Sequence, residues 1–375
     1  MSGLKVSDSK ISDCPTYNFC AGPAGLPKVV LERAQTEILD WQGLGASVME
    51  ISHRSAEFQA LAKKAEADFR ELLNIGDSHV VLFLHGGATQ QFSNIPMTLL
   101  SHSNQEAEYL SNGVWSEKAV AEARRFGKVN SIDVVRKNDK GQYFVSDLSD
   151  CQRSENPAYT HFTPNETIEG FRISGVPKTS GAVIADLSSS ILSEQLNIDD
   201  YDMIYAGAQK NIGPAGMTVV IVKKSLFEKM NFDSSPQTFN YQLQAKKESM
   251  LNTPATYSWY LSSLVFEWLK EQGGVAQMEA NAIEKSALLY NLIDNDGFYL
   301  NPIEKNYRSR MNVRFALHDE SLNDLFLSEA KKANLIGLKG HRSIGGMRAS
   351  IYNAVSVDAV KVLVSFMEQF RSNHG

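Results

Sequence analysis

The sequence predicts an α/β protein in which helices cover both faces of a mostly parallel β-sheet. One observation is that short apolar runs typical of buried strands alternate with helical segments between about residues 79 and 222. Another is that turn-forming residues separate these segments. The third is length, because 375 residues exceed the roughly 250–300 at which single cores stop growing. We therefore expect two domains.

Two helices are expected before the alternating region, over Lys28–Leu39 and Glu57–Leu73. In the second of these, Phe58, Leu61 and Ala65 recur near the helical period and form one apolar face.

The alternating region places several polar groups at the ends of strands. The expected strands are HVVLFL (79–84), AEYLS (107–111), AVIAD (182–186), MIYAGA (203–208) and TVVIV (218–222), with helices after HGGATQQF and over 116–127. In open sheets, ligands bind beyond the carboxyl ends of the strands. Asp186, the segment His85–Thr89 and the pair Gln209–Lys210 all follow such ends, which indicates one shared site.

The pattern changes near residue 270. A helix over Tyr257–Lys270 ends before Gly273 and Gly274, and the expected elements after it are a helix over 277–293, an alternating strand over 308–317, and helices over Ser321–Ala333 and 357–370. We predict a large domain over 17–270 and a smaller one over 271–375. The N-terminal arm, 1–16, is expected to pack on the smaller domain.

Composition argues against several classes of protein. The formal net charge of −6 does not suit a general nucleic-acid binder. No apolar run approaches the roughly 20 residues needed to cross a bilayer, and the N-terminal residues resemble neither a secretory signal nor a transit peptide. Cys14, Cys20 and Cys151 have no disulfide-like or metal-like spacing. We expect a cytoplasmic protein without a metal, nucleic-acid or membrane partner.

The most informative residue is a lysine between two apolar runs. Lys210 precedes a Gly/Pro/Gly turn, where desolvation can lower the pKa of an amine nucleophile. Asp186 ends another apolar run. A lysine that forms a Schiff base, and an aspartate that keeps a pyridine nitrogen protonated, are what pyridoxal phosphate requires. The alternative is that Lys210 is a turn lysine and Asp186 a helix N-cap.

Three further features could belong to such a site. The Gly86–Gly87 turn opens a helix whose amides suit a phosphate, although such a turn is also common for structural reasons. Trp115 precedes a helix and could stack on a planar ring, or it could simply fill the core. Thr167 could form a hydrogen bond with a phenolic oxygen.

Cations at both ends of the chain indicate a substrate with two anionic groups. His53 and Arg54 follow an apolar-rich stretch, and His341, Arg342 and Arg348 lie near the C-terminus. Arginine binds carboxylate and phosphate through two parallel hydrogen bonds, and histidine adds a donor. The alternative is a solvated basic surface.

In its motifs the chain resembles the phosphoserine aminotransferases, which are pyridoxal phosphate enzymes of the type I fold in class V. The motifs span nearly the whole length: NFCAGPAGLP, EISHRS, HGGATQQF, NGVWSEKA, PNETIEG, AGAQKNIGPAG, NTPATY and GHRSIGGMRASIYNA. The resemblance implies a seven-stranded, mostly parallel sheet in the large domain and a smaller C-terminal α/β domain. It also implies pyridoxal 5′-phosphate as the cofactor and a homodimer with shared active sites.

The resemblance further implies residue roles at the cofactor. Lys210 would form the Schiff base and Asp186 would bind the pyridinium nitrogen. Trp115 would stack on the ring and Thr167 would contact its 3-oxygen. The residues that would hold the cofactor phosphate are Ala88, Thr89 and Gln209, with Asn252 and Thr253 of the second subunit.

It also implies how the substrate is bound. His53, Arg54, His341 and Arg342 would meet the phosphate or distal carboxylate, and Arg348 would meet the α-carboxylate. Some members of the family have an arginine at the position of Thr89. Binding of the substrate phosphate must therefore depend here on the other cations.

The implied reaction is transamination between L-glutamate and 3-phosphohydroxypyruvate, giving 2-oxoglutarate and O-phospho-L-serine for serine biosynthesis. One alternative is another class V aminotransferase of the alanine–glyoxylate type, whose substrates carry no phosphate. A cysteine desulfurase or lyase is a second, although a desulfurase needs a mobile nucleophilic cysteine and none follows Cys151. A non-catalytic binding module with the same fold is the third.

Overall fold

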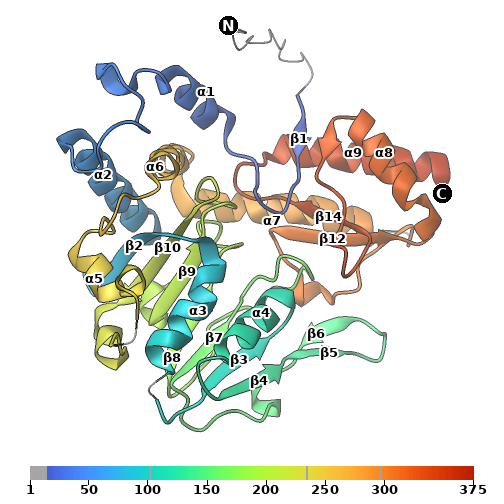
Figure 1. The fold of residues 1–375 in the computed structure, drawn as a ribbon. Helices are drawn as coiled ribbons and strands as arrows, with labels where there is room; N and C mark the ends of the chain where they lie inside the picture. The colour runs from blue at the N-terminus through green and yellow to red at the C-terminus, as the bar shows by residue number, and fades with distance from the viewer. Residues whose placement is uncertain (1–14, 102, 234, 296) are drawn as a thin grey trace, which may run out of the picture.

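The structure, a computed structural model, describes residues 15–375 except 102, 234 and 296. A large sheet carries helices on both faces, and a smaller sheet lies beside it towards the C-terminus (Figure 1). The α/β prediction is thus confirmed. The predicted arm over 1–16 lies outside the described residues, apart from residues 15 and 16.

The large sheet has seven strands in the order β2-β10-β9-β8-β7-β3-β4. Their bounds are β2 (His79–His85), β3 (Ala107–Ser111), β4 (Val129–Asp133), β7 (Tyr159–Phe162), β8 (Ala182–Asp186), β9 (Met203–Gly207) and β10 (Met217–Lys223). Only β10 runs antiparallel to its neighbours. The carboxyl ends of the other six strands therefore lie at one edge. The edge strand β4 was not predicted, because it is half-exposed and has no apolar run.

The helices begin and end largely where the sequence pattern predicts. Their bounds are α1 (Lys28–Glu37), α2 (Ala56–Leu73), α3 (Gly87–Leu99), α4 (Val114–Ala123), α5 (Tyr241–Lys246), α6 (Thr256–Glu271), α7 (Gly274–Ile293), α8 (Asn323–Lys332) and α9 (Val357–His374). In α2, the hydroxyl of Ser55 accepts a hydrogen bond from the amide of Phe58 at 3.3 Å, which caps the first turn. Asn74, with a φ of 51°, ends the same helix in the left-handed conformation.

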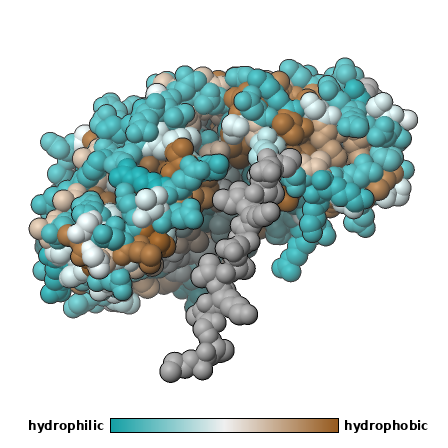
Figure 2. Space-filling model, turned by 90° about the horizontal axis from the view of Figure 1, so that it is seen from above, coloured by the Kyte–Doolittle hydropathy of each residue, from teal (hydrophilic) through white to brown (hydrophobic). Residues whose placement is uncertain are grey.

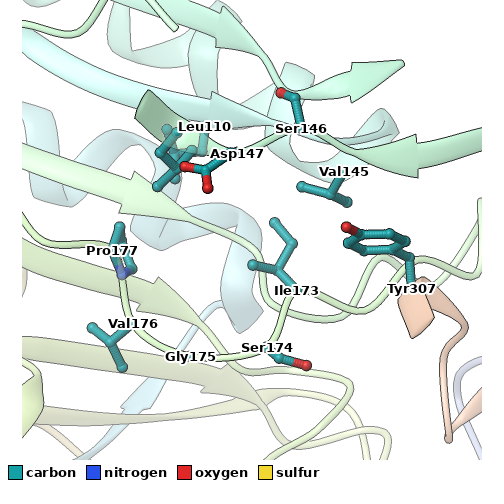
Figure 3. Close-up of a pocket in the computed structure, with 11 residues that line it drawn as sticks. Leu110, Val145, Ser146, Asp147, Ile173, Ser174, Gly175, Val176, Pro177 and Tyr307 are labelled. Atoms are coloured by element: carbon teal, nitrogen blue, oxygen red, sulfur yellow. The ribbon is translucent and has the colours of Figure 1, made fainter. Parts of the chain in front are cut away.

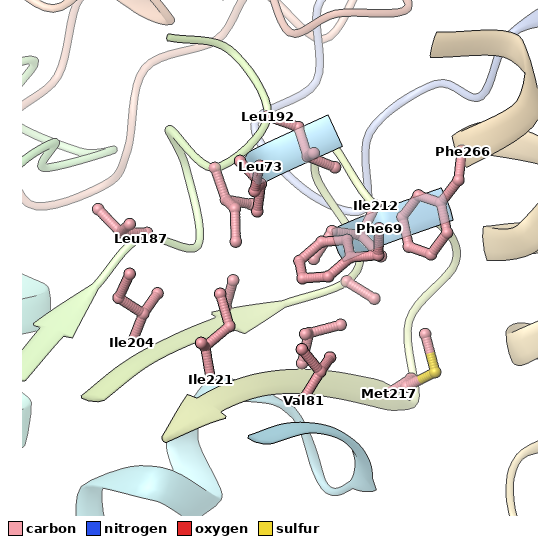
Figure 4. Close-up of a cluster of buried hydrophobic side chains, with 14 of the residues drawn as sticks. Phe69, Leu73, Val81, Leu187, Leu192, Ile204, Ile212, Met217, Ile221 and Phe266 are labelled. Atoms are coloured by element: carbon pink, nitrogen blue, oxygen red, sulfur yellow. The ribbon is translucent and has the colours of Figure 1, made fainter. Parts of the chain in front are cut away.

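The two faces of the sheet have separate cores because side chains alternate along each strand. Val81 and Phe83 of β2 pack on the face covered by α2 and α6, whereas Leu82 and Leu84 pack on the face covered by α3 and α4. Figure 4 shows the first core, in which Phe69 and Leu73 of α2 and Phe266 of α6 lie over Val81, Ile204 and Ile221 of the strands.

The C-terminal region has its own sheet and its own core. Its antiparallel sheet has the order β11-β12-β14, with bounds β11 (Tyr299–Leu300), β12 (Asn312–Leu317) and β14 (Met347–Ser350). Residues of α7, α8 and α9 pack on it. The strand predicted over 308–317 begins only at Asn312. The reason is a turn in which Ser309 Oγ accepts hydrogen bonds from the amides of Met311 and Asn312.

A hairpin of β5 (Val135–Lys137) and β6 (Tyr143–Val145) extends from the large sheet (Figure 1). Both strands are three residues long, which is too short for a periodic signal in the sequence.

An N-terminal segment connects the two regions. Strand β1 (Tyr17–Asn18) pairs in parallel with β13 (Leu335–Ile336), and Phe19 belongs to the C-terminal core. The amide of Ala24 then donates to the carbonyl oxygen of Gln209 at 2.8 Å. Residues 17–24 thus run from the C-terminal core to the turn that contains Lys210. The division into domains over 17–270 and 271–375 stays a prediction.

Seen from above, the surface is mostly hydrophilic, with hydrophobic residues between the polar ones (Figure 2). Several of the exposed apolar side chains belong to α1 and the residues after it: Val29, Leu31, Leu39, Leu44 and Met49. None of the described helices is both long and apolar enough to span a bilayer.

Candidate active site

The candidate site lies at the carboxyl edge of the large sheet, where β7, β8 and β9 end. Asp186 is the last residue of β8, and it is directly opposite Tyr205 of β9 in the strand register. Thr167 follows β7, and Lys210 follows β9 by three residues. Parallel strands therefore bring together side chains that are far apart in the sequence.

Lys210 is buried in a turn and points to Thr167. Its Nζ donates a hydrogen bond to Thr167 Oγ1 at 2.6 Å. Burial lowers the pKa of Lys210 to about 8, although the charges of Asp186 and Glu166 oppose the decrease; Arg348 adds to it. The unprotonated fraction of this amine near neutral pH is therefore much larger than that of an ordinary lysine, as a nucleophile or general base requires.

Asp186 is buried and held by neighbouring donors. Its Oδ1 accepts hydrogen bonds from the amide of Ser188 at 2.9 Å and from Ser188 Oγ at 2.5 Å. Burial raises the pKa of Asp186, while these hydrogen bonds and the charge of Lys210 oppose the increase. The Asp186 carboxylate thus accepts hydrogen bonds from Ser188. It also lines a cavity, where it can accept a further hydrogen bond from an N–H group of a ligand.

Trp115 stands in the first turn of α4, beside Lys210. The Nζ of Lys210 lies 5.8 Å from the centre of the indole ring, which leaves space for a flat ring on the indole face. The backbone of this turn is fixed by Glu166, whose carboxylate accepts from the amide of Trp115 at 3.3 Å and from that of Ser116 at 2.8 Å.

The first turn of α3 lines the same cavity as Asp186 and Lys210. Gly86, with a φ of 96°, turns the chain from β2 into this helix, which begins at Gly87. Ala88 and Thr89 occupy its first turn, where amide groups have no partner within the helix. These amides and the helix dipole suit a phosphate group. Gln209, beside Lys210, lines the same cavity.

These residues surround one cavity of about 90 Å³, whose lining includes Ala88, Thr89, Trp115, Thr167, Asp186, Gln209 and Lys210. The set fits pyridoxal phosphate: an acid for the ring nitrogen, an amine, an indole for the ring face and a helix N-terminus for the phosphate. Two buried polar atoms on the lining residues, Trp115 Nε1 and Thr163 Oγ1, have no partner among the described residues. Buried polar groups normally have one, so these atoms also favour a polar ligand.

A larger cavity of about 620 Å³ adjoins the first and shares Gly87, Trp115, Thr167, Gln209 and Lys210 with it. Arg348 and His341 line this larger cavity. Arg348 lies on β14, and burial lowers the pKa of its guanidinium. Burial and the nearby charges of Arg348, Arg342 and Lys118 lower the pKa of His341. Two anion-binding residues predicted from the sequence, Arg348 and His341, thus lie beside the amine.

Five predicted residues do not line either cavity within a single chain: His53, Arg54, Asn252, Thr253 and Arg342. Arg54, Asn252, Thr253 and Arg342 are exposed, and His53 is half-buried. Thr253 is nevertheless connected to the turn before α3, because His85 Nε2, next to Gly86, lies 3.1 Å from the carbonyl oxygen of Thr253.

The structure also adds residues that were not predicted. The Nζ of Lys118 lies 4.4 Å from the centre of the Trp115 ring, and Lys118 lines the larger cavity. Lys118 is three residues after Trp115 on a predicted helix. This spacing places both side chains on one face of the helix and could have indicated that Lys118 lies at the site. Ser188, two residues after Asp186, has the spacing of a turn that caps a carboxylate. Tyr205 lies inside an apolar run, and nothing in the pattern distinguishes it from a core residue.

A separate hollow of about 290 Å³ lies below the β5–β6 hairpin (Figure 3). Its lining is largely apolar, with Leu110, Val145, Ile173 and Val176, and it has one carboxylate, Asp147. No lysine, arginine or histidine is among its lining residues. It does not suit an anionic substrate, and none of the predicted site residues lies in it.

The chain is similar to known proteins over nearly its full length. The profile of the family Aminotransferase class-V matches residues 16–363. A phosphoserine aminotransferase from Acinetobacter baylyi is 53% identical over 96% of this chain and 99% of its own length.

Two solved structures are also similar. Phosphoserine aminotransferase from Bacillus circulans subsp. alkalophilus is 40% identical with a TM-score of 0.91, and the match covers 96% of this chain and 99% of that chain. A phosphoserine aminotransferase from Trichomonas vaginalis with bound pyridoxal phosphate is 37% identical with a TM-score of 0.89, over 94% of this chain and 100% of that chain.

Proposed function

Because the chain belongs to the class-V aminotransferases, and within them to the phosphoserine aminotransferases, we propose that it transfers the amino group of L-glutamate to 3-phosphohydroxypyruvate. The products are O-phospho-L-serine and 2-oxoglutarate, as serine biosynthesis requires. The cofactor is pyridoxal 5′-phosphate. The observation that carries this proposal is that two cavities adjoin each other. Lys210 and Asp186 line the smaller cavity, and Arg348 and His341 line the larger one.

The residues of the chain have separate tasks in this reaction. Bound pyridoxal phosphate supplies an electron-withdrawing ring that stabilises negative charge at the substrate Cα. Lys210 removes the proton from Cα, and its lowered pKa makes the free amine available near neutral pH. Asp186 holds the proton on the ring nitrogen. Trp115 covers the ring face, and Thr167 binds the 3-oxygen.

The remaining contacts hold the two ligands in place. Ala88, Thr89 and Gln209 bind the cofactor phosphate through the N-terminus of α3 and the turn after β9. Arg348 binds the α-carboxylate that glutamate and phosphohydroxypyruvate share. His341 binds the distal group, which is a carboxylate in one substrate and a phosphate in the other.

We further propose that two copies of the chain form a homodimer with shared active sites. Four of the predicted residues outside the cavities, Arg54, Asn252, Thr253 and Arg342, are exposed in one chain, and His53 Nε2 is buried without a partner among the described residues. In the dimer, Asn252 and Thr253 reach the cofactor phosphate of the neighbouring subunit. His53, Arg54 and Arg342 complete the binding site for the distal anion. The exposed apolar side chains of α1, including Val29 and Leu31, suit such an interface.

The proposal also includes a division into domains and a cellular compartment. The chain divides into a cofactor-binding domain over 17–270 and a smaller domain over 271–375. The protein works in the cytoplasm, and the free thiols of Cys20 and Cys151 are compatible with that reducing compartment.

An assay of the purified protein tests the function. L-glutamate is supplied with either 3-phosphohydroxypyruvate or glyoxylate, and 2-oxoglutarate is measured. We expect turnover with the phosphorylated keto acid and a kcat/KM lower by at least about 100-fold with glyoxylate, since lost hydrogen bonds to charged groups cost about 1.5–3 kcal/mol each. Equal or faster turnover with glyoxylate would exclude the proposed substrate.

A further inference from the structure

Three buried side chains lie in a row beneath the cofactor site. His161 of β7, Asp186 of β8 and Tyr205 of β9 stand on adjacent parallel strands, and their exposed fractions are 2%, 5% and 0%. Asp186 and Tyr205 are directly opposite each other in the register. Only Asp186 of the three lines the cavity.

Two groups stabilise the ionised form of Asp186. Ser188 donates through its amide and through its hydroxyl, at 2.9 and 2.5 Å. The amide of Gly207 donates to Ser188 Oγ at 3.0 Å, so the proton of this hydroxyl is directed to Asp186. The second group is Tyr205, which lies directly opposite Asp186 on β9 and whose hydroxyl opposes the increase in the pKa of Asp186 that burial causes.

The Tyr205 hydroxyl also contacts His161. His161 Nε2 and the Tyr205 hydroxyl oxygen are 2.8 Å apart. A carboxylate only accepts hydrogen bonds, so Tyr205 can serve Asp186 only with its single proton, and His161 then donates to the tyrosine oxygen. This requires the tautomer with the proton on Nε2. The other ring nitrogen, Nδ1, has no partner among the described residues, which agrees with that tautomer.

The surroundings keep His161 neutral and in place. Burial lowers the pKa of His161 to about 3. Its ring is stacked on that of Tyr109, with ring centres 4.7 Å apart, and also on that of Tyr205 at 5.8 Å. A neutral His161 with its proton on Nε2 thus directs the Tyr205 proton towards Asp186.

We propose that Tyr205, oriented by His161, is a positioning residue that holds the Asp186 carboxylate ionised and aimed at the ring nitrogen of the cofactor. This inference rests on the proposed function and deepens it. A buried carboxylate that loses one donor gains proton affinity. It then competes better for the proton that the ring nitrogen must keep, and Cα deprotonation becomes slower.

The proposal is tested with the holoenzyme, loaded with pyridoxal phosphate carrying ¹⁵N at the ring nitrogen. Tyr205→Phe removes one hydroxyl and keeps the ring. We expect its ¹⁵N resonance to move from the protonated towards the unprotonated value and kcat to fall by about 10–100-fold, the range for a hydrogen bond to a charged group. The KM for glutamate should change by less than about threefold, because Tyr205 does not line the substrate cavity.

Matched variants separate positioning from packing. Tyr109→Phe removes another buried hydroxyl, which is hydrogen-bonded to Tyr159 at 2.8 Å, and it should leave the resonance unchanged. His161→Leu should move the resonance in the direction of Tyr205→Phe. His161→Gln, which keeps an N–H donor near the position of Nε2, should restore most of the wild-type value.

The outcomes are decisive in either direction. If Tyr205→Phe is folded, by thermal melting, and keeps the wild-type resonance, Asp186 does not depend on Tyr205. An equal shift in Tyr109→Phe would make the effect one of general packing and also overturn the proposal. A wild-type protein without turnover would instead contradict the proposed function, while the ¹⁵N comparison among variants still tests the role of Tyr205.

Discussion

Arg348 Nη1 donates a hydrogen bond to the backbone carbonyl oxygen of Thr167 at 3.2 Å. The side chain of the same threonine accepts from Lys210 Nζ at 2.6 Å. One residue therefore connects the cation proposed to bind the α-carboxylate with the amine proposed to act on the adjacent Cα. The connection joins β14 of the C-terminal sheet to the edge of the large sheet, so the distance between the two groups depends on how both sheets are held.

Replacing Lys210 with Ala should reduce kcat by about 10³-fold or more, near the upper range for loss of a general base. The reason is that no other amine lines the smaller cavity. Steady-state assays with saturating substrates measure the effect. Lys223→Ala is the control, since Lys223 lies at the far end of β10 and should retain normal turnover. Normal turnover of Lys210→Ala would contradict the mechanism.

Replacing Arg348 with Lys should raise the KM for both substrates by about tenfold or more. Lysine keeps the charge but loses the two parallel donors that match a carboxylate, and hydrogen bonds to charged groups contribute about 1.5–3 kcal/mol. Both substrates carry the α-carboxylate, so both values of KM should rise together. A rise for phosphohydroxypyruvate alone would assign Arg348 to the phosphate instead.

Replacing Gly86 with Ala should weaken cofactor binding by about tenfold. At a φ of 96° a side chain is strained by about 1–3 kcal/mol, and the added Cβ would overlap the side chain of Gln90 in α3. Gly45→Ala is a matched control, because Gly45 also has a positive φ, of 71°, but no atom lies within 4 Å of the added Cβ. Fluorescence titration of the apoenzyme gives the dissociation constants. Equal dissociation constants of the two variants for the cofactor would mean that the α3 turn does not contribute to binding of its phosphate.

Glu166→Gln should make stability less dependent on pH. Burial, and then the charge of Glu169, raise the pKa of Glu166 to about 8 from 4.5. As pH rises between these values, the unfolded chain loses this proton while the folded chain keeps it. The free energy of unfolding therefore falls, by at most about 1.4 kcal/mol per pH unit. Urea unfolding from pH 5 to 8 should show a shallower decrease for the variant. If the free energy of unfolding changed equally with pH in the wild type and the variant, Glu166 would be ionised over the whole range from pH 5 to 8.

The buried strands were predictable because both faces of the large sheet are covered. Residues 80–84, 182–185 and 219–222 are therefore continuous apolar runs. The antiparallel direction of β10 was not predictable, since an apolar run carries no information on strand direction. The strands β4, β5 and β6 are short and partly exposed, and they give no pattern that can be distinguished from loops.

The candidate site was partly predictable because parallel strands end at a common edge. This rule brought Asp186, Lys210 and the turn before Thr89 to one location, and the structure places them around one cavity. Tyr205 and His161 could not be identified, because their polar atoms are directed across neighbouring strands inside the sheet. The proposed positions of His53 and Arg54 near a substrate would require a second chain, which a single sequence pattern does not reveal.

The N-terminal segment at residues 17–24 has a consequence for biosynthesis. It is synthesised before every strand of the large sheet, whereas its strand partner, Leu335–Ile336, is synthesised after all of them. Domains generally fold as units while the chain is still being synthesised. The large sheet can therefore form before the segment that contacts Gln209 through Ala24 is anchored at its other end. Competence to hold the coenzyme should appear only once Leu335–Ile336 has been synthesised.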